Sequence, residues 1–470
     1  MIKVERRKIY WFLIYPLAAI TFIVLSLFFI LSARGYNIRI GADGITFHKT
    51  GMLIISSKPT GAKIFLNGKD TTHTTGFFSI KIDNLGKDKY HLKLTKDGYY
   101  SWEKNVPIEP EMVTWANYIL MFPKNPTIDK VNISGTLIDS LTSLDNKSQI
   151  FLIKLNDSYK ISVFNDATSQ SNIILDTAAL PPDQKITDPR LLDWSNDKRY
   201  ILFSGIVSGK EVIYILNTDS KTLTDFSSIT PVKFDQLRFD PANSSLLYGL
   251  SGGLVMNIDL GTRKVSPALE SQVVYYTFAD DGKIYYVKDN SGQRSFIQAN
   301  GDFSGKNTLA DSIPVSPSYE AKVEFQSQQV AFKTADNTLY LITKTDGKNM
   351  LITFSKNVSD FSWSPDGERL LYQGDGKVKV FENDEIEKSS TEYSMPDSGY
   401  SNLIWYDSRH ILGEKGSKAI IMDFDETNQV TLGQSIAGEI PFYSSDNGDI
   451  FFFSNLGAKD SILSRYTVKF

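Results

Sequence analysis

The sequence predicts a mainly β protein with an N-terminal transmembrane helix, a small antiparallel β-sandwich and a seven- or eight-bladed β-propeller. Three observations predict this order. The chain begins with a long apolar run, continues with short alternating runs separated by turn residues, and ends with one pattern repeated at intervals of about 38–50 residues. The predicted parts are a cytoplasmic N-terminus (1–8), the helix (9–33), a juxtamembrane segment (34–50), the sandwich (51–123) and the propeller (127–470).

The composition is that of a folded globular protein. Of 470 residues, 41% are hydrophobic and 22% are charged, and the chain has no cysteine. The absence of cysteine excludes disulfides, thiolate metal sites and a cysteine nucleophile. His48, His73, His91 and His410 are the only histidines, and none lies at metal-motif spacing from another. We therefore predict neither a metal nor another cofactor.

Residues 9–33 are uncharged and long enough to span a hydrocarbon core of about 30 Å. Basic residues precede this run from Lys3 to Lys8, and Arg34 is the only charge immediately after it. By the positive-inside rule, residues 1–8 are cytoplasmic and the later domains are extracytoplasmic. The alternative is a cleaved signal peptide, because LSA at 31–33 loosely resembles a cleavage site. The apolar region of such a peptide is usually only about 7–15 residues long, so we favour an uncleaved signal anchor in the cell membrane.

Charge divides unevenly along the chain. Because the whole chain carries −4 and residues 1–124 carry +8, residues 125–470 carry −12. A basic module close to a membrane is able to meet anionic wall polymers or lipid headgroups. The simpler interpretation is solvated lysines on strand faces. The acidic distal module argues against binding to nucleic acid, which requires basic stripes.

Residues 51–123 alternate short apolar runs with turn signals. Asn67-Gly68 predicts a type I′ hairpin, because both central residues of that turn need positive φ. Asp97-Gly98 marks a second turn. Pro59 and Gly61 mark a sharp reversal before the next strand. Five to seven short strands in about 70 residues predict a small antiparallel sandwich.

The stretches SKPTGAKIFLNGK (57–69) and TGFFSIKIDNLGKDKYHLKLTKDGYYSWEKNVPI (75–108) resemble a PEGA domain. The chain departs from the family pattern at Thr60, which replaces its glutamate, at Thr74-Thr75-Gly76, which replaces Thr-Pro, and in the longer turn at 85–88. The resemblance implies an immunoglobulin-like sandwich of surface proteins, without an agreed ligand or catalytic residue. The matching positions are Pro59, Gly61, Ala62, Asn67, Gly68, Leu85, Tyr90, Gly98 and Tyr99.

The rest of the chain repeats an aromatic residue, a polar turn and an apolar strand. Clear copies are WSNDKRYILF (194–203), FDPANSSLLY (239–248), FADDGKIYYV (278–287), WSPDGERLLY (363–372) and YSSDNGDIFFF (443–453). Weaker copies begin at 144, 325 and 405. A repeat of this length with several strands predicts propeller blades, with the aromatic residue packed between neighbouring blades. Eight copies suggest eight blades, or seven if one is split. Residues 127–137 are the candidate closing strand.

WSPDGERLLY resembles the TolB/WD40-like repeats of bacterial propellers, which indicate a fold and not an activity. The positions that carry this structural pattern are Trp194, Trp363, Pro365, Asp366, Gly367 and Trp405.

Signals for catalysis or ion binding are weak. The G-x-S-x-G pattern at 249–253 lies between two predicted strands, whereas a nucleophile elbow needs a strand followed by a helix. Two acidic turns, 280–282 and 423–426, lack the ligand spacing of an EF-hand, so ordinary hairpins explain them better than calcium sites.

We therefore expect a non-enzymatic, membrane-anchored scaffold of the bacterial envelope. Its PEGA-like stalk presents a propeller that binds an envelope protein or glycan at the cell surface. The alternative is a glycan-processing enzyme with its site on the propeller axis. His410 is the only histidine there, so that chemistry would depend on carboxylates.

Overall fold

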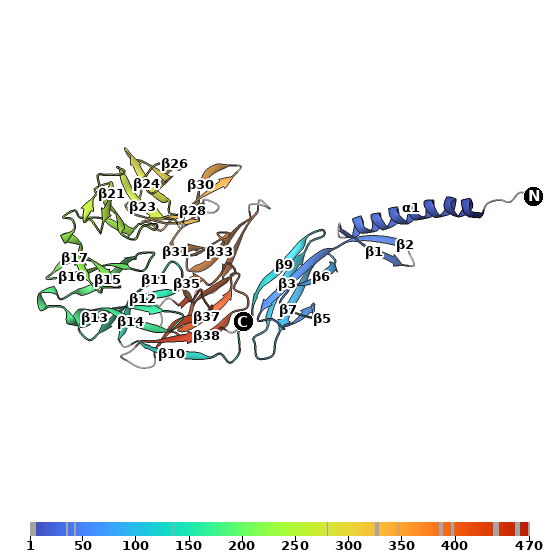
Figure 1. Ribbon diagram of the computed structural model, residues 1–470, viewed down its shortest axis with the longest axis horizontal. Coiled ribbons are helices and arrows are strands. Elements are labelled where there is room, and N and C mark those ends of the chain that lie inside the picture. The colour runs from blue at the N-terminus through green and yellow to red at the C-terminus, as the bar shows by residue number, and fades with distance from the viewer. Residues whose placement is uncertain are drawn as a thin grey trace, which may run out of the picture. The chain divides into compact units, whose positions relative to one another are not determined.

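The computed structural model describes residues 6–33, 36–41, 44–133, 135–279, 281–324, 329–345, 347–384, 389–395, 399–435, 441–455 and 461–468 (Figure 1). Residues 1–5 of the predicted cytoplasmic segment and Asp280 of the first acidic turn lie outside these ranges. The chain forms two compact units, one up to residue 126 and one over residues 127–468. Each unit is described by itself.

The first unit begins with helix α1 (Arg6–Ala33), which starts three residues before the predicted bound. The apolar side chains that are described in α1 between Ile14 and Ile30 are at least half exposed. Across the helical positions with described side chains, none of the helices combines the length and apolar character needed to cross a membrane. Residues 34–50, expected to be a juxtamembrane segment, contain an antiparallel hairpin of β1 (Tyr36–Gly41) and β2 (Gly44–Lys49).

A two-sheet sandwich follows in the same unit. One sheet has the order β6-β3-β9 and the other β5-β4-β7-β8. Strand β3 pairs with β9 in parallel, so the prediction of a wholly antiparallel sandwich was wrong at this pair. The chain passes from one sheet to the other between β8 and β9, and an alternating sequence pattern carries no information about strand direction. The strands are β3 (Gly51–Lys58), β4 (Lys63–Leu66), β5 (Lys69–Thr74), β6 (Ile80–Leu85), β7 (Asp88–Thr95), β8 (Trp102–Ile108) and β9 (Val113–Leu120).

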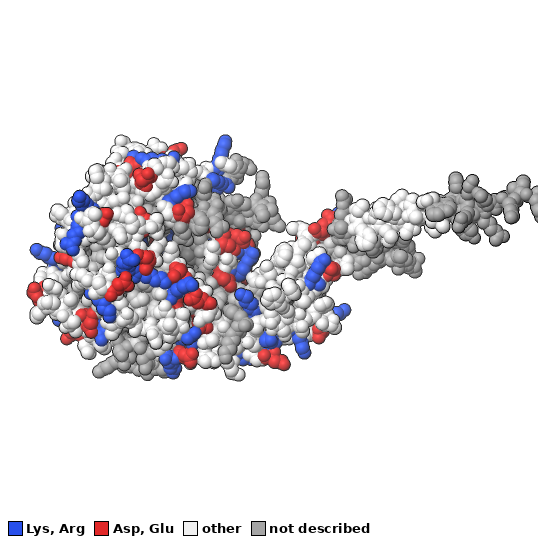
Figure 2. All heavy atoms as spheres, viewed as in Figure 1, with Lys and Arg blue, Asp and Glu red and all other residues white. Residues whose placement is uncertain are grey.

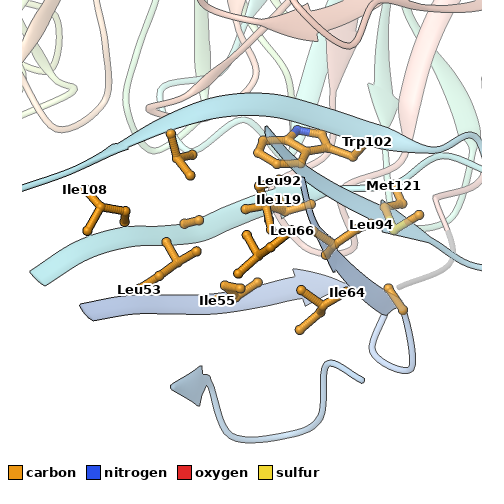
Figure 3. Close-up of a cluster of buried hydrophobic side chains, with 13 residues drawn as sticks. Leu53, Ile55, Ile64, Leu66, Leu92, Leu94, Trp102, Ile108, Ile119 and Met121 are labelled. Carbon is orange, nitrogen blue, oxygen red and sulfur yellow. The ribbon is translucent and has the colours of Figure 1, made fainter. Parts of the chain in front are cut away.

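The sandwich encloses its own hydrophobic core (Figure 3). Alternate residues of β3 are buried, as expected for a strand with one face on a core. Trp102 is the largest side chain of this core and packs edge-on against Tyr118, with ring centroids 6.1 Å apart. The core residues are Leu53, Ile55, Ala62, Ile64, Leu66, Leu92, Leu94, Trp102, Val106, Ile108, Ala116, Ile119 and Met121.

The second unit is a β-propeller, in which the described residues form eight four-stranded sheets (Figure 1). Seven sheets contain four strands in chain order, joined as antiparallel hairpins. The first strands are β11 (Thr136–Thr142), β15 (Thr187–Trp194), β19 (Gln236–Phe239), β23 (Val273–Phe278), β27 (Tyr319–Glu324), β31 (Val358–Trp363), β35 (Tyr400–Trp405) and β39 (Phe442–Tyr443). The second strands are β12 (Ser148–Leu155), β16 (Tyr200–Val207), β20 (Leu246–Ser251), β24 (Ile284–Asn290), β28 (Gln329–Thr334), β32 (Arg369–Gly374), β36 (His410–Lys415) and β40 (Ile450–Asn455).

The third and fourth strands complete each sheet. The third strands are β13 (Ser158–Asn165), β17 (Lys210–Asn217), β21 (Leu254–Asp259), β25 (Gln293–Ala299), β29 (Leu339–Thr345), β33 (Lys377–Asp384), β37 (Lys418–Asp423) and β41 (Ser461–Tyr466). The fourth strands are β14 (Gln170–Asp176), β18 (Leu223–Asp225), β22 (Lys264–Val265), β26 (Asn307–Ile313), β30 (Lys348–Ser355), β34 (Ser389–Met395), β38 (Val430–Gln434) and β10 (Ile128–Ile133). Short 3₁₀ helices are η1 (Thr177–Ala179), η2 (Pro182–Gln184) and η3 (Phe226–Ser228).

The last sheet joins the two ends of this unit. Its order is β10-β41-β40-β39, and β10 pairs with β41 from Ile128 to Ile133. The prediction that residues 127–137 supply a closing strand is therefore confirmed. Because three strands of this sheet come from the C-terminal end and one from the N-terminal end, separating the ends would break a row of main-chain hydrogen bonds.

Candidate functional site

The first strands of the propeller sheets surround its axis. First strands of neighbouring sheets contact one another at β11 and β15, β15 and β19, β23 and β27, β27 and β31, and β31 and β35. Loops and side chains at this axis are where propellers usually present a binding surface. The axis is therefore the first place to look for a site.

Side-chain hydrogen bonds join seven successive first strands, from β11 to β35, at six junctions. Two of the bonds use carboxylates that accept from the main chain, and two use the indole N–H of Trp363 and Trp405. Because these contacts occupy main-chain groups on the strand edges, the ring of first strands is closed to further strand pairing at those positions. The bonds are Leu191 N–H to Asp139 (3.1 Å), Phe239 N–H to Asp193 (2.7 Å), Gln236 Nε2 to Tyr276 O (2.8 Å), Ala321 N–H to Tyr275 Oη (3.0 Å), Trp363 Nε1 to Lys322 O (3.1 Å) and Trp405 Nε1 to Ser362 O (3.2 Å).

A cavity of about 650 Å³ opens where four of these strands converge. This volume lies within the range of small-molecule sites in proteins. We call it the axial cavity. Its lining comes from β19, β23, β27, β31 and the turn after β31, and includes Arg238, Tyr275, Thr277, Phe278, Glu320, Lys322, Ser362, Trp363 and Pro365.

The cations of the axial cavity are loosely paired. Arg238 Nη1 lies 3.8 Å from Asp193 Oδ1, and Lys322 Nζ lies 4.0 Å from Glu320 Oε1. Both cationic side chains are half exposed. Glu320 has a closer partner in Lys333 at 3.1 Å. The cavity therefore presents two accessible positive groups.

Asp193 is the most constrained carboxylate near the cavity. Burial raises its pKa, while Arg238 and the main-chain N–H groups of Phe239 and Trp194 act in the opposite direction. Its oxygens already accept from both N–H groups. This arrangement fits a structural role at the junction of β15 and β19.

The PEGA motif residues lie at turns of the sandwich, with Gly61 and Ala62 before β4 and Asn67 and Gly68 after it. Asn67 and Gly68 both have positive φ, at 49° and 77°, which confirms the type I′ turn. Gly61 and Gly98 also have positive φ, and the Lys58–Pro59 peptide bond is cis. Ala62 is fully buried, and Tyr99 packs against the core.

Thr75 belongs to the stretch Thr74-Thr75-Gly76, which departs from the family pattern, and it bonds to the turn before β4. Its Oγ1 accepts from the N–H of Ala62 at 3.0 Å and lies 2.8 Å from Ser57 Oγ. Its main chain also pairs with Gly61 and Ala62. The stretch that departs from the family pattern therefore supplies a side-chain acceptor for the buried N–H of Ala62.

The repeat residues form the turn between the first and second strands. Ser364 Oγ donates to Asp366 and accepts from the N–H of Arg369 at 3.0 Å. Gly367 has φ of 74°, and a Cβ at that position would lie 2.3 Å from the side chain of Glu324. Trp363 and Trp405 contact the preceding sheet, as predicted for the repeat aromatics. The buried Trp194 occupies the same position, but its indole nitrogen has no hydrogen-bond partner in the described part of the chain.

The weaker sequence signals resolve into ordinary local structure. Ser251 ends β20, and Gly252 and Gly253 form the turn to β21, which confirms a hairpin at 249–253. The described residues contain no group of three or more His, Asp or Glu side chains placed to hold a metal ion.

Sequence reasoning missed two arrangements of polar side chains. His410 is buried, with Nδ1 2.8 Å from Asp407 and Nε2 3.5 Å from Asp423. Arg238 and Lys322 were also missed, since the repeat pattern marks only hydrophobic and turn positions. The available signal was a charged residue near the end of a first strand.

Figure 2 shows acidic and basic side chains intermixed over the described part of the visible propeller face. No broad basic area appears among the described residues on that face. The expectation that the protein does not bind nucleic acid stays a prediction.

Comparison with known proteins gives one family match and several similar solved structures. Residues 50–122 match the PEGA domain family. No curated protein matches the chain. Similar solved structures include an oligogalacturonate lyase in complex with manganese, at 14% identity and TM-score 0.39, covering 71% of this chain and 98% of that one. TolB from Acinetobacter baumannii is 17% identical with TM-score 0.32, covering 56% and 59%.

A third similar structure is the β-propeller domain of Cps50 (Swd1) from "Myceliophteria_thermophila". It is 10% identical with TM-score 0.40, and the match covers 72% of this chain and 99% of that chain. The family match and the sheet order together identify residues 50–122 as a PEGA domain, followed in the chain by a β-propeller.

Proposed function

We propose that this protein is a membrane-anchored, non-catalytic binding protein of the bacterial cell envelope, with the axial cavity of the propeller as its ligand site. The eight four-stranded sheets are, in this proposal, the eight blades of one ring. The observation that carries the proposal is the axial cavity, in which four first strands place charged and polar side chains around one space.

The proposed anchor rests on separate observations. Residues 9–33 are uncharged in the sequence, and the described apolar side chains of α1 are at least half exposed. Exposed apolar surface of this extent is unfavourable in water and is covered in a bilayer. The basic residues before the run place the N-terminus in the cytoplasm and the two later domains outside.

The test compares retention on isolated cell envelope of the source organism. Purified residues 37–470 and the fragment 37–124 are incubated with washed envelope, and a second sample of 37–470 carries Lys322→Glu in the axial cavity. We expect retention of 37–470, little retention of the fragment, and a clear loss with Lys322→Glu.

Other outcomes count against the proposal. Retention of the fragment alone, released by salt, would make the basic PEGA domain the binding element. Retention of neither would refute envelope binding. The anchor is tested by alkaline extraction of membranes, in which the full chain stays in the pellet and a variant lacking residues 9–33 does not.

A further inference from the structure

Arg238, Thr277, Lys322 and Ser362 occupy equivalent positions on four successive first strands. Trp363 donates to the carbonyl of Lys322 and Trp405 donates to that of Ser362, which fixes the correspondence between β27 and β31. Arg238 and Thr277 each lie one residue before the end of their strands. All four residues line the axial cavity. From β19 to β31, the successive strands therefore place a cation, a hydroxyl, a second cation and a second hydroxyl at the cavity.

The two cations are exposed and the neighbouring carboxylates are better satisfied. The side chains of Arg238 and Lys322 are each 50% exposed, whereas that of Asp193 is 19% exposed. Glu320 is shared with the nearly buried Lys333 at 3.1 Å. Half-exposed ion pairs of about 4 Å contribute little stability, so Arg238 and Lys322 are able to exchange their partners for a ligand. An oxyanion is the ligand group that suits two such cations.

The surrounding contacts favour a sugar over a peptide as the carrier of that oxyanion. A peptide that joins a sheet edge needs free main-chain groups. At this cavity the N–H of Ala321 and the carbonyls of Lys322 and Ser362 are already bonded to neighbouring sheets. The ligand is therefore recognised by side chains. Phe278 and Trp363 supply aromatic surface beside the polar groups. A sugar ring has apolar faces and hydroxyl groups at its edges, so it suits a site where polar groups lie next to aromatic faces.

We infer that the axial cavity binds an acidic sugar unit of a glycan, with its carboxylate or phosphate between Arg238 and Lys322. The hydroxyls of Thr277 and Ser362 lie beside that group on the neighbouring strands. This inference rests on the proposed function and names the ligand chemistry of the same site. Arg238 and Lys322 share the lining with the carboxylates Glu320 and Glu324, so the ligand competes with carboxylates for the two cations.

The test is calorimetric titration of the purified full chain in neutral detergent. The probes are glucuronate, glucose 6-phosphate, glucose, inorganic phosphate and a tetraglutamate peptide. We expect at least one acidic sugar to bind, glucose not to bind, and affinity to fall as salt rises. Binding of glucuronate alone identifies a carboxylate, and binding of glucose 6-phosphate alone identifies a phosphate.

Four variants separate the charge from the fold. Arg238→Gln and Lys322→Gln are each expected to weaken binding by about tenfold or more, while Arg238→Lys retains part of the affinity. Lys210→Gln removes the same charge at an exposed hairpin position and is expected to change nothing. Urea unfolding of every variant verifies that the fold persists. If a glutamine variant unfolds, the conservative Arg238→Lys and the salt dependence still test the inference.

Three outcomes would overturn the inference: no acidic sugar binds, the peptide or inorganic phosphate binds more tightly than both sugars, or Arg238→Gln and Lys322→Gln bind like Lys210→Gln. Envelope retention of wild-type protein, unchanged in both glutamine variants, would refute the acidic-sugar site and leave envelope binding intact. If the wild-type protein is not retained on the envelope, the proposed function itself is refuted.

Discussion

Replacing Asp166 by asparagine is expected to stabilise the propeller at alkaline pH and to have little effect at acidic pH. Asp166 follows β13, is fully buried and has neither carboxylate oxygen hydrogen-bonded within the described structure. Burial raises its pKa from 3.8 to about 7, and this effect exceeds the opposing influence of Gln149 and Lys198. The folded protein therefore holds the carboxyl in its neutral form up to about neutral pH.

The sign and size of the effect follow from proton linkage. Between pH 3.8 and about 7 the folded state binds a proton at Asp166 that the unfolded state has released, so the free energy of unfolding falls as pH rises. At about 1.4 kcal/mol per pKa unit, the whole loss is about 4 kcal/mol, and the part between pH 5 and pH 8 is about 3 kcal/mol. Asparagine has the shape of the carboxyl without its charge and avoids this loss.

The assay is urea unfolding of the full chain at pH 5 and pH 8, with the propeller transition followed by tryptophan fluorescence. The Asp166→Asn variant should gain stability over wild type by about 3 kcal/mol more at pH 8 than at pH 5. The control is Asp157→Asn in the exposed β12–β13 hairpin, which should show no such difference. An equal change at both pH values for Asp166→Asn would refute the assigned pKa and its cause.

Three further substitutions test the packing of the two domains by urea unfolding. Gly367→Ala should destabilise the propeller by about 1–3 kcal/mol, because its Cβ would overlap Glu324 at positive φ; Gly376→Ala has positive φ with open space around it and should lose less. Trp405→Phe should destabilise the propeller by about 1 kcal/mol more than Trp194→Phe, because of these two residues Trp405 alone has a hydrogen-bonded indole N–H in the described structure. Equal losses of stability in the two variants would contradict the role of that bond. Thr75→Val should destabilise the PEGA domain by about 1–3 kcal/mol by leaving the buried N–H of Ala62 without its acceptor, and the exposed Thr74→Val is the control.

The bonds between neighbouring first strands support the proposal that the axial cavity recognises its ligand through side chains. Six junctions between neighbouring first strands use side chains to satisfy main-chain groups at the axis. Two of these contacts join β19 to β23 and β23 to β27, and so connect the strands that carry Arg238 and Lys322. The backbone positions of the two side chains are therefore set before a ligand binds, which reduces the part of the ordering penalty that comes from the main chain.

Local chemistry in the sequence determined much of this protein. Asn67-Gly68 determined a type I′ turn because few residues tolerate positive φ at both positions, and the structure confirms it. The repeated aromatic and polar-turn pattern determined the blade hairpins, and residues 127–137 determined the closing strand. In each case the residues within one short segment carry the physical reason for its conformation.

Only the tertiary structure decided which distant residues meet. The parallel pairing of β3 with β9 depends on how the chain crosses between two sheets, and an alternating pattern is the same for either strand direction. Arg238 and Lys322 are 84 positions apart in the sequence and line one cavity because β23 is hydrogen-bonded both to β19 and to β27. Likewise, the pKa of Asp166 depends on burial by the assembled sheets, which no local pattern encodes.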